Sequence, residues 1–207
     1  LYIGLMILQP YLETLVPASV DGRWLYGLRV GIVLMALLVL WRYFGELKEA
    51  PEARASDWLL GAGVGIVVFV LWIYRDFKPL AFSPGEGFNP NTEDGLDVGL
   101  VIVRLAGAAL IVPVMEELFW RSFLLRWIHH PSFISVDPKR VGLKPLLASS
   151  VLFASEHRLW FAGLLAGLAY AWLYKKTGNI WVPILAHAVT NGILGAYVLT
   201  TGSWAFW

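Results

Sequence analysis

Apolar runs of about twenty residues recur along this sequence, and they restrict the folds open to it more than any other feature. In helical form, a run of that length crosses the roughly 30 Å hydrocarbon core of a bilayer. Hydrophobic residues fill 58% of the 207 positions and charged residues only 15%, whereas soluble domains carry about 25% charged residues. The sequence therefore predicts an all-α fold, a polytopic bundle of transmembrane helices.

Seven hydrophobic segments are expected to span the membrane as a single transmembrane domain over residues 1–207. They are residues 1–16, 24–44, 58–74, 98–128, 145–157, 160–174 and 181–200. An eighth span could precede residue 1, or could arise if the long segment 98–128 broke at Pro113, which cannot donate a helical hydrogen bond. We expect seven to eight spans, with Pro113 kinking its helix and freeing a carbonyl nearby.

Basic residues are distributed unevenly between alternate loops, which predicts the orientation of the chain. Nine Lys and Arg residues belong to the loops around residues 50, 135 and 177, against five in the loops between them. Because loops rich in Lys and Arg stay in the cytoplasm, we place these three loops there. No basic cluster points to nucleic acid as a partner.

Two adjacent glutamates and an arginine interrupt the long apolar segment, in the run Glu116-Glu117-Leu118-Phe119-Trp120-Arg121. Charged groups are expensive at membrane depth and usually face a protein interior or a wet cavity. Glu117 and Arg121 stand four residues apart, the spacing at which opposite charges pair on a helix. Glu116 points about 100° away from Glu117 and remains available. One held and one available carboxylate suit acid/base catalysis, and a buried structural network is the alternative.

Three further polar sets interrupt the hydrophobic segments. His157 ends one expected span, and His187 and Asn191 share a face of the last span, one helical turn apart. Arg104, near the outer end of its segment, is expected to extend its side chain to the membrane interface. A lone histidine in a span is more often a helix–helix hydrogen-bond donor than a catalyst. Two histidines, an asparagine and a glutamate together supply the base, proton carrier and oxyanion donors that amide hydrolysis needs.

Other routes to peptide hydrolysis lack their residues in this sequence. It has no His-Glu-x-x-His zinc motif, no Gly-x-Ser-x-Gly serine motif and no cysteine. No aspartate falls within an expected span, so a paired aspartyl mechanism has no residues to use. A glutamate acting with histidine remains.

Three motifs in order, Glu116-Glu117-x-x-x-Arg121, Phe153-x-x-x-His157 and His187-x-x-x-Asn191, resemble those of the CAAX prenyl protease and bacteriocin-processing family. That family comprises type II CAAX endopeptidases and their bacterial relatives, which are all-helical intramembrane proteases of typically eight spans. The similarity covers residues 98–200, the expected catalytic core, and the layout also resembles the exosortase-associated members. The resemblance implies an integral protein of the bacterial inner membrane.

The resemblance also implies a role for each motif residue. Glu116 would be the general base that activates water, assisted by His157, while His187 and Asn191 would stabilise the oxyanion. Glu117 and Arg121 would hold the site in shape. We expect no cofactor, because asparagine suits an oxyanion hole better than a metal site. Zinc is the alternative, and its ligands would then be Glu116, His157 and His187.

The predicted function is that of an intramembrane endopeptidase cleaving a membrane-associated peptide or a protein C-terminal tail. Its expected partners are membrane lipid and this substrate. A proton-coupled transporter is one alternative, since Glu and His also serve as proton relays. It would show flux that depends on Glu116 without hydrolysis, but the sequence has no repeated half typical of transporters. A non-catalytic scaffold or immunity protein, the other alternative, would keep its biological function in a Glu116→Gln strain.

Overall fold

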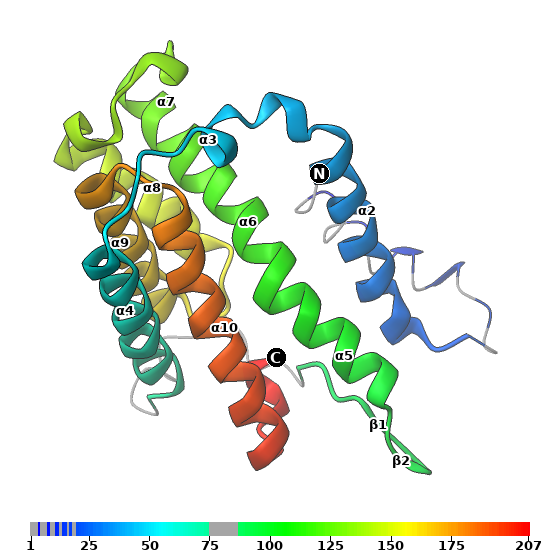
Figure 1. Cartoon of the computed structure of the whole chain (residues 1–207). Coiled ribbons are helices and arrows are strands. Elements are labelled where there is room, and N and C mark those ends of the chain that lie inside the picture. The colour runs from blue at the N-terminus through cyan, green and yellow to red at the C-terminus, as the bar shows by residue number, and fades with distance from the viewer. Residues whose placement is uncertain are drawn as a thin grey trace.

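The computed structural model describes residues 20–74 and 87–207, together with isolated positions before residue 20, and this part of the chain is predominantly helical (Figure 1). Its helices are α2 (Leu25–Val39), α3 (Gly45–Lys48), α4 (Ala55–Ile73), α5 (Val98–Ala106), α6 (Val112–Glu117), α7 (Arg126–His129), α8 (Leu143–Ser155), α9 (Trp160–Thr177) and α10 (Trp181–Thr201). A hairpin precedes α5, and its two antiparallel strands, β1 (Asn91–Thr92) and β2 (Gly95–Leu96), have two residues each. The predicted all-α class is confirmed.

Four described helical stretches are long and apolar enough to cross a membrane: Gly22–Val39, Ala55–Ile73, Val98–His129 and Trp181–Thr201. The expected spans 145–157 and 160–174 correspond to α8, a shorter apolar helix, and to α9. The expected span 1–16 lies mostly outside the described residues. These apolar helices are those of an integral membrane protein.

The long segment does not break at Pro113, so it forms one helix of 32 residues instead of two spans. The α5, α6 and α7 parts of this helix are joined by two π-helical stretches, Gly107–Ile111 and Leu118–Leu125. In the first, the Val112 N–H bonds to Gly107 O, five residues back. The same pattern would pair Ala108 O with residue 113, but proline has no N–H. The carbonyl of Ala108 is thereby left open inside an intact helix.

Helix α10 lies at the centre of the bundle, in contact with α4, α6 and α9 (Figure 1). Its contact with α4 depends on glycine, because a Cβ at Gly65 would collide with the carbonyl oxygen of Ala186. Thr190 Oγ1 donates to the carbonyl oxygen of Gly65 across this contact, at 2.8 Å. Helix α2 packs on the other side of the long helix, against α5 and α6. The long helix therefore lies between α2 and the α10 side of the bundle.

The three loops predicted to share one side of the membrane lie at the same end of the molecule. The indole of Trp181 donates to Leu47 O at 2.9 Å, and Asn179 Nδ2 donates to Pro51 O at 2.5 Å. Lys175 Nζ donates to Val141 O at 2.5 Å. These contacts join the loops around residues 50, 135 and 177. Their location in the cytoplasm stays a prediction.

Glu46 lies near these loops and connects three helical segments through hydrogen bonds. Its carboxylate accepts hydrogen bonds from Ser122 and Tyr174, and from Arg126 Nη2 at 2.8 Å. Arg126 also donates to Ser122 Oγ at 2.8 Å. Glu46 is on α3, Ser122 on the second π-helical stretch and Tyr174 on α9. The network thus fastens the segment after α2 to the helix that carries Glu116.

Candidate active site

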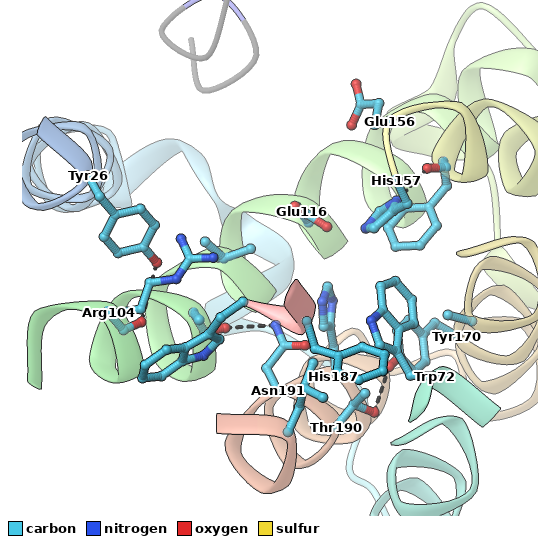
Figure 2. Close-up of a pocket in the computed structure, with 17 residues that line it drawn as sticks. Tyr26, Trp72, Arg104, Glu116, Glu156, His157, Tyr170, His187, Thr190 and Asn191 are labelled. Carbon is cyan, nitrogen blue, oxygen red and sulfur yellow. Dashed lines mark hydrogen bonds between the residues drawn. The ribbon is translucent and has the colours of Figure 1, made fainter. Parts of the chain in front are cut away.

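One cavity of about 470 Å³ is lined by Glu116, His157, His187 and Asn191, and we call it the reactive pocket (Figure 2). Glu116 comes from α6, His157 from the turn that follows α8, and the other two residues from α10. Three segments far apart in the sequence therefore meet at one hollow. The four predicted catalytic residues are brought together here, and the two supporting residues lie behind them.

Glu117 and Arg121, the supporting pair, are buried and joined by two contacts. Arg121 Nε lies 3.1 Å from Glu117 Oε2, and Arg121 Nη1 donates to Glu117 Oε1 at 3.1 Å. Arg121 Nη2 also donates to the carbonyl oxygen of Gly167 on α9, at 3.3 Å. The guanidinium carbon lies 4.5 Å from the centroid of the Phe153 ring. The arginine thus fixes the Glu117 carboxylate against α8 and α9.

His187 is oriented by the same carboxylate. Its Nδ1 lies 2.9 Å from Glu117 Oε1, and its ring stacks on Tyr170 at 5.0 Å between centroids and 22° between planes. Because an ionised carboxylate only accepts, Nδ1 carries the proton and Nε2 is the nitrogen left for a ligand in the pocket. A carboxylate behind a histidine fixes the tautomer and the ring direction.

Glu116 differs from its neighbour in having its carboxylate at the pocket. Its Oε2 is buried and has no hydrogen-bond partner among the described residues. Glu116 also lines a second, mainly apolar cavity of about 230 Å³ between α2 and the long helix. Figure 2 shows Glu116, His157 and His187 around the same hollow. One glutamate is held and the other is open to the pocket, as the sequence predicted.

His157 is held by the end of the helix before it. Its Nδ1 lies 2.7 Å from the carbonyl oxygen of Phe153. A carbonyl only accepts, so Nδ1 is the protonated nitrogen and Nε2 of the neutral ring is an acceptor. The ring packs at 4.4 Å from the Phe153 ring and edge-on to Trp72 at 5.4 Å. His157 therefore offers a proton acceptor to the pocket.

Asn191 is anchored by the carbonyl that Pro113 leaves open. Its Nδ2 donates to Ala108 O at 2.8 Å. An amide nitrogen carries two hydrogens, so one N–H stays available to a ligand. The predicted release of a carbonyl near the glutamates is confirmed, and this carbonyl positions a residue of the last helix.

Several residues around the pocket were not singled out from the sequence. Tyr170 donates to Thr190 Oγ1 at 2.7 Å and supports the His187 ring, while Trp72 and Glu156 line the pocket wall. Thr190 lies three residues after His187, a spacing that places both near one helical face. Trp72 and Tyr170 carry no comparable signal, because aromatic residues are common throughout the spans.

The zinc alternative stays a prediction. No group of three His, Asp or Glu side chains within residues 20–74 and 87–207 is arranged to hold a metal ion. We therefore derive no step through a metal.

Comparison with known proteins agrees with this geometry. Residues 98–193, which contain all three motifs, match the family model described as type II CAAX prenyl endopeptidase Rce1-like. Over 201 residues the chain is 25% identical to a protein of Bacillus subtilis (strain 168) named "Putative membrane peptidase YdiL", a match covering 88% of this chain and 73% of that protein. No solved structure matches the chain significantly. Residues 98–193 are therefore similar to the Rce1-like type II CAAX prenyl endopeptidases, and they lie within a bundle of apolar membrane helices.

Proposed function

We propose that the chain is an intramembrane endopeptidase that hydrolyses a peptide bond in a membrane-associated peptide or protein tail without a metal ion. The observation that carries this proposal is the open carboxylate of Glu116, which shares one cavity with His157, His187 and Asn191. The similarity of residues 98–193 to Rce1-like endopeptidases supports the same class of reaction.

In the first step, Glu116 accepts a proton from a water molecule that His157 Nε2 helps to orient. The resulting hydroxide attacks the carbonyl carbon of the scissile bond. A glutamate can act as base here because its carboxylate has no competing donor among the described residues. General-base catalysis of this kind contributes about 10²- to 10⁴-fold to the rate.

In the second step, negative charge develops on the carbonyl oxygen and is met by two donors. Asn191 contributes its remaining amide hydrogen. His187 contributes Nε2–H when its ring carries a second proton, a charge that Glu117 balances from the other side. When the tetrahedral intermediate collapses, the carbon–nitrogen bond breaks and Glu116 returns its proton to the leaving amine. Glu117 and Arg121 act as positioning residues, since they reach the substrate only through His187.

Cleavage of membrane-protein termini by wild-type and Glu116→Ala protein, compared by mass spectrometry in reconstituted vesicles, tests this function. We expect substrate tails to be shortened by the wild type only. His187→Ala should lose cleavage as well, while both variants keep the elution profile and thermal unfolding of a folded protein. Full activity of both variants on a verified substrate would refute the proposal.

Arg140→Gln provides a matched control, because Arg140 lies in the loop at the far end of α9 from the pocket and its side chain is 86% exposed. This substitution should leave cleavage unchanged. Ion flux that requires Glu116, without any hydrolysis, would instead identify a proton-coupled transporter.

A further inference from the structure

A groove of about 540 Å³ lies between α4 and α9, which contact each other along the bundle (Figure 1), and we call it the α4–α9 groove. Its lining carries no charged side chain, and it shares no described residue with the lining of the reactive pocket. On α4, the lining residues recur every three or four positions from Leu59 to Leu71, so they form one stripe along the helix. Val68 in this stripe is 2% exposed, whereas Leu59 and Val67 are 75% and 58% exposed. The groove is therefore open to the surroundings of the bundle.

The length of the groove corresponds to the depth of one leaflet. Leu59 and Leu71 are twelve residues apart, which is roughly 18 Å along the axis of α4. The hydrocarbon of one leaflet is about 15 Å deep, half of the bilayer core. Gly63 lies in the α4 stripe, and nothing lies within 4 Å of a Cβ built there. The missing side chain leaves room for an apolar chain that lies along the groove.

Lys176 gives one end of the groove a positive charge. Helix α4 begins and α9 ends at this end of the molecule, where Asn179 Nδ2 donates to Pro51 O. Trp172 lines the groove, and Lys176 follows it by about one turn, nearer the end of α9. The Lys176 Nζ lies 5.0 Å from the centroid of the Trp172 ring. An ammonium group has three N–H donors, so one that is held on the face of an indole ring can still bind an anion.

The chemistry of the groove matches that of a phospholipid. Tryptophan and lysine side chains at the end of a membrane helix lie at the level of the lipid headgroups. Within the described part of the chain, no carboxylate forms a salt bridge with Lys176. A phospholipid presents an apolar chain to the groove and a phosphate to this ammonium group. A helix of a second copy would cover the ammonium group with apolar side chains instead, and a buried charge without a partner is costly.

We propose that the α4–α9 groove binds one anionic phospholipid, with an acyl chain along the α4 stripe and the phosphate at Lys176. This inference goes beyond the endopeptidase function and does not depend on it, because the groove and the reactive pocket are lined by different residues. A lipid bound there contacts both α4 and α9. It therefore stabilises the folded bundle, as any ligand of the native state does.

Native mass spectrometry of the purified protein tests the proposal. The protein is released from detergent micelles that contain equal concentrations of phosphatidylglycerol and phosphatidylcholine with identical acyl chains, and the retained lipids are counted. We expect one retained lipid, with phosphatidylglycerol preferred by about fivefold, the factor that one lysine contributes at an anionic surface. Lys176→Gln should abolish this preference without removing the lipid. Gly63→Leu, whose side chain would fill the groove, should lose both lipids.

Each variant has a matched control that leaves the groove intact. Lys144→Gln removes an exposed lysine at the start of α8, and Gly31→Leu adds the same side chain in open space on α2. Both controls should retain lipid as the wild type does. Phosphatidylglycerol should also raise the midpoint of thermal unfolding of the wild type more than phosphatidylcholine does, and this difference should vanish in Lys176→Gln.

A lipid preference that Lys176→Gln leaves unchanged, or lipid retention that Gly63→Leu leaves unchanged, would overturn the proposal. A dimer that disappears in Gly63→Leu would overturn it in favour of a second copy of the chain. None of these measurements depends on hydrolysis. Failure of the proposed endopeptidase function would therefore leave the lipid site in place.

Discussion

Asn191 Nδ2 lies 2.8 Å from the carbonyl oxygen of Ala108, an acceptor left open by the missing N–H of Pro113. A break in the hydrogen bonding of one helix thus positions a side chain of another. Backbone carbonyls freed near a proline in a membrane helix need such a donor, because no water is available in the hydrocarbon core. In the mechanism proposed above, this relationship would make Pro113 a positioning residue.

Pro113→Ala should reduce the rate of hydrolysis by about tenfold or more while leaving the protein folded. Alanine supplies an N–H that can bond to Ala108 O and displace Asn191, and one oxyanion donor is worth about 10²- to 10³-fold. The measurement is the cleavage rate at saturating substrate. Pro145→Ala is the matched control: Pro145 lies in the first turn of α8, where the missing N–H has little consequence. Equal effects of the two substitutions would contradict this role.

The two adjacent glutamates should respond oppositely to removal of their charge. Glu117→Gln should destabilise the protein by about 3–5 kcal/mol, because it leaves the buried guanidinium of Arg121 without its carboxylate. Glu116→Gln should abolish hydrolysis and change the stability by less than about 1 kcal/mol, because Oε2 has no partner to lose among the described residues. Thermal unfolding in detergent, compared with cleavage, distinguishes the two. The prediction fails if Glu117→Gln unfolds like the wild type.

Gly65→Ala should weaken the contact between α4 and α10 by about 1–3 kcal/mol, the usual cost of overpacking. The added Cβ would meet Ala186 O and disturb the bond from Thr190, which supports Tyr170 and, through it, His187. Activity should fall together with stability. Gly63→Ala is the control on the same helix, because nothing lies within 4 Å of a Cβ there. A similar loss in both variants would argue against this contact.

Chelation of metal ions should leave hydrolysis unchanged, since no group of three candidate ligands is assembled in the described part of the chain. The assay compares cleavage before and after dialysis against EDTA, with and without added zinc. Activity that disappears on dialysis and returns with zinc would show that Glu116, His157 and His187 form a metal site instead.

Single cysteines at Asp137 and at Glu93 should be labelled from opposite sides of the membrane, with Asp137 on the cytoplasmic side. The chain contains no cysteine of its own, so each introduced thiol reports one position. Asp137 lies in the loop packed against the end of α9, and Glu93 lies in the hairpin before α5. The accessibility of each thiol is measured with an impermeant maleimide, applied to intact cells and to broken cells. Labelling of Asp137→Cys in intact cells would reverse the predicted orientation.

Local spacing made much of the site predictable. The pairing of Glu117 with Arg121 depends only on a four-residue separation within one helix, and the structure contains it. The grouping of His157 and His187 with Glu116 followed from their rarity in apolar segments and from the motif resemblance. The contact of His187 with Glu117 could not be foreseen, because spacing fixes no distance between different helices.

The course of the long helix was harder to anticipate. Proline led us to allow two spans, yet the helix continues through Pro113 by widening one turn. A π-helical turn has no sequence signature of its own, and it decides which residues share a face. Arg104 was therefore expected at the membrane interface, although its side chain lines the reactive pocket.

The Glu46 network lies across the boundary of the Rce1-like match. Ser122 and Arg126 fall inside residues 98–193, while the carboxylate that joins them to Tyr174 comes from α3. Gly65, at which α4 and α10 make close contact, also lies outside residues 98–193. Residues 98–193 expressed alone would keep every motif but lose the acceptor for three donors and the surface on which His187 and Asn191 are held. The matched region therefore depends on contacts from α3 and α4, and we expect that grafting it into another membrane protein would require both helices as well.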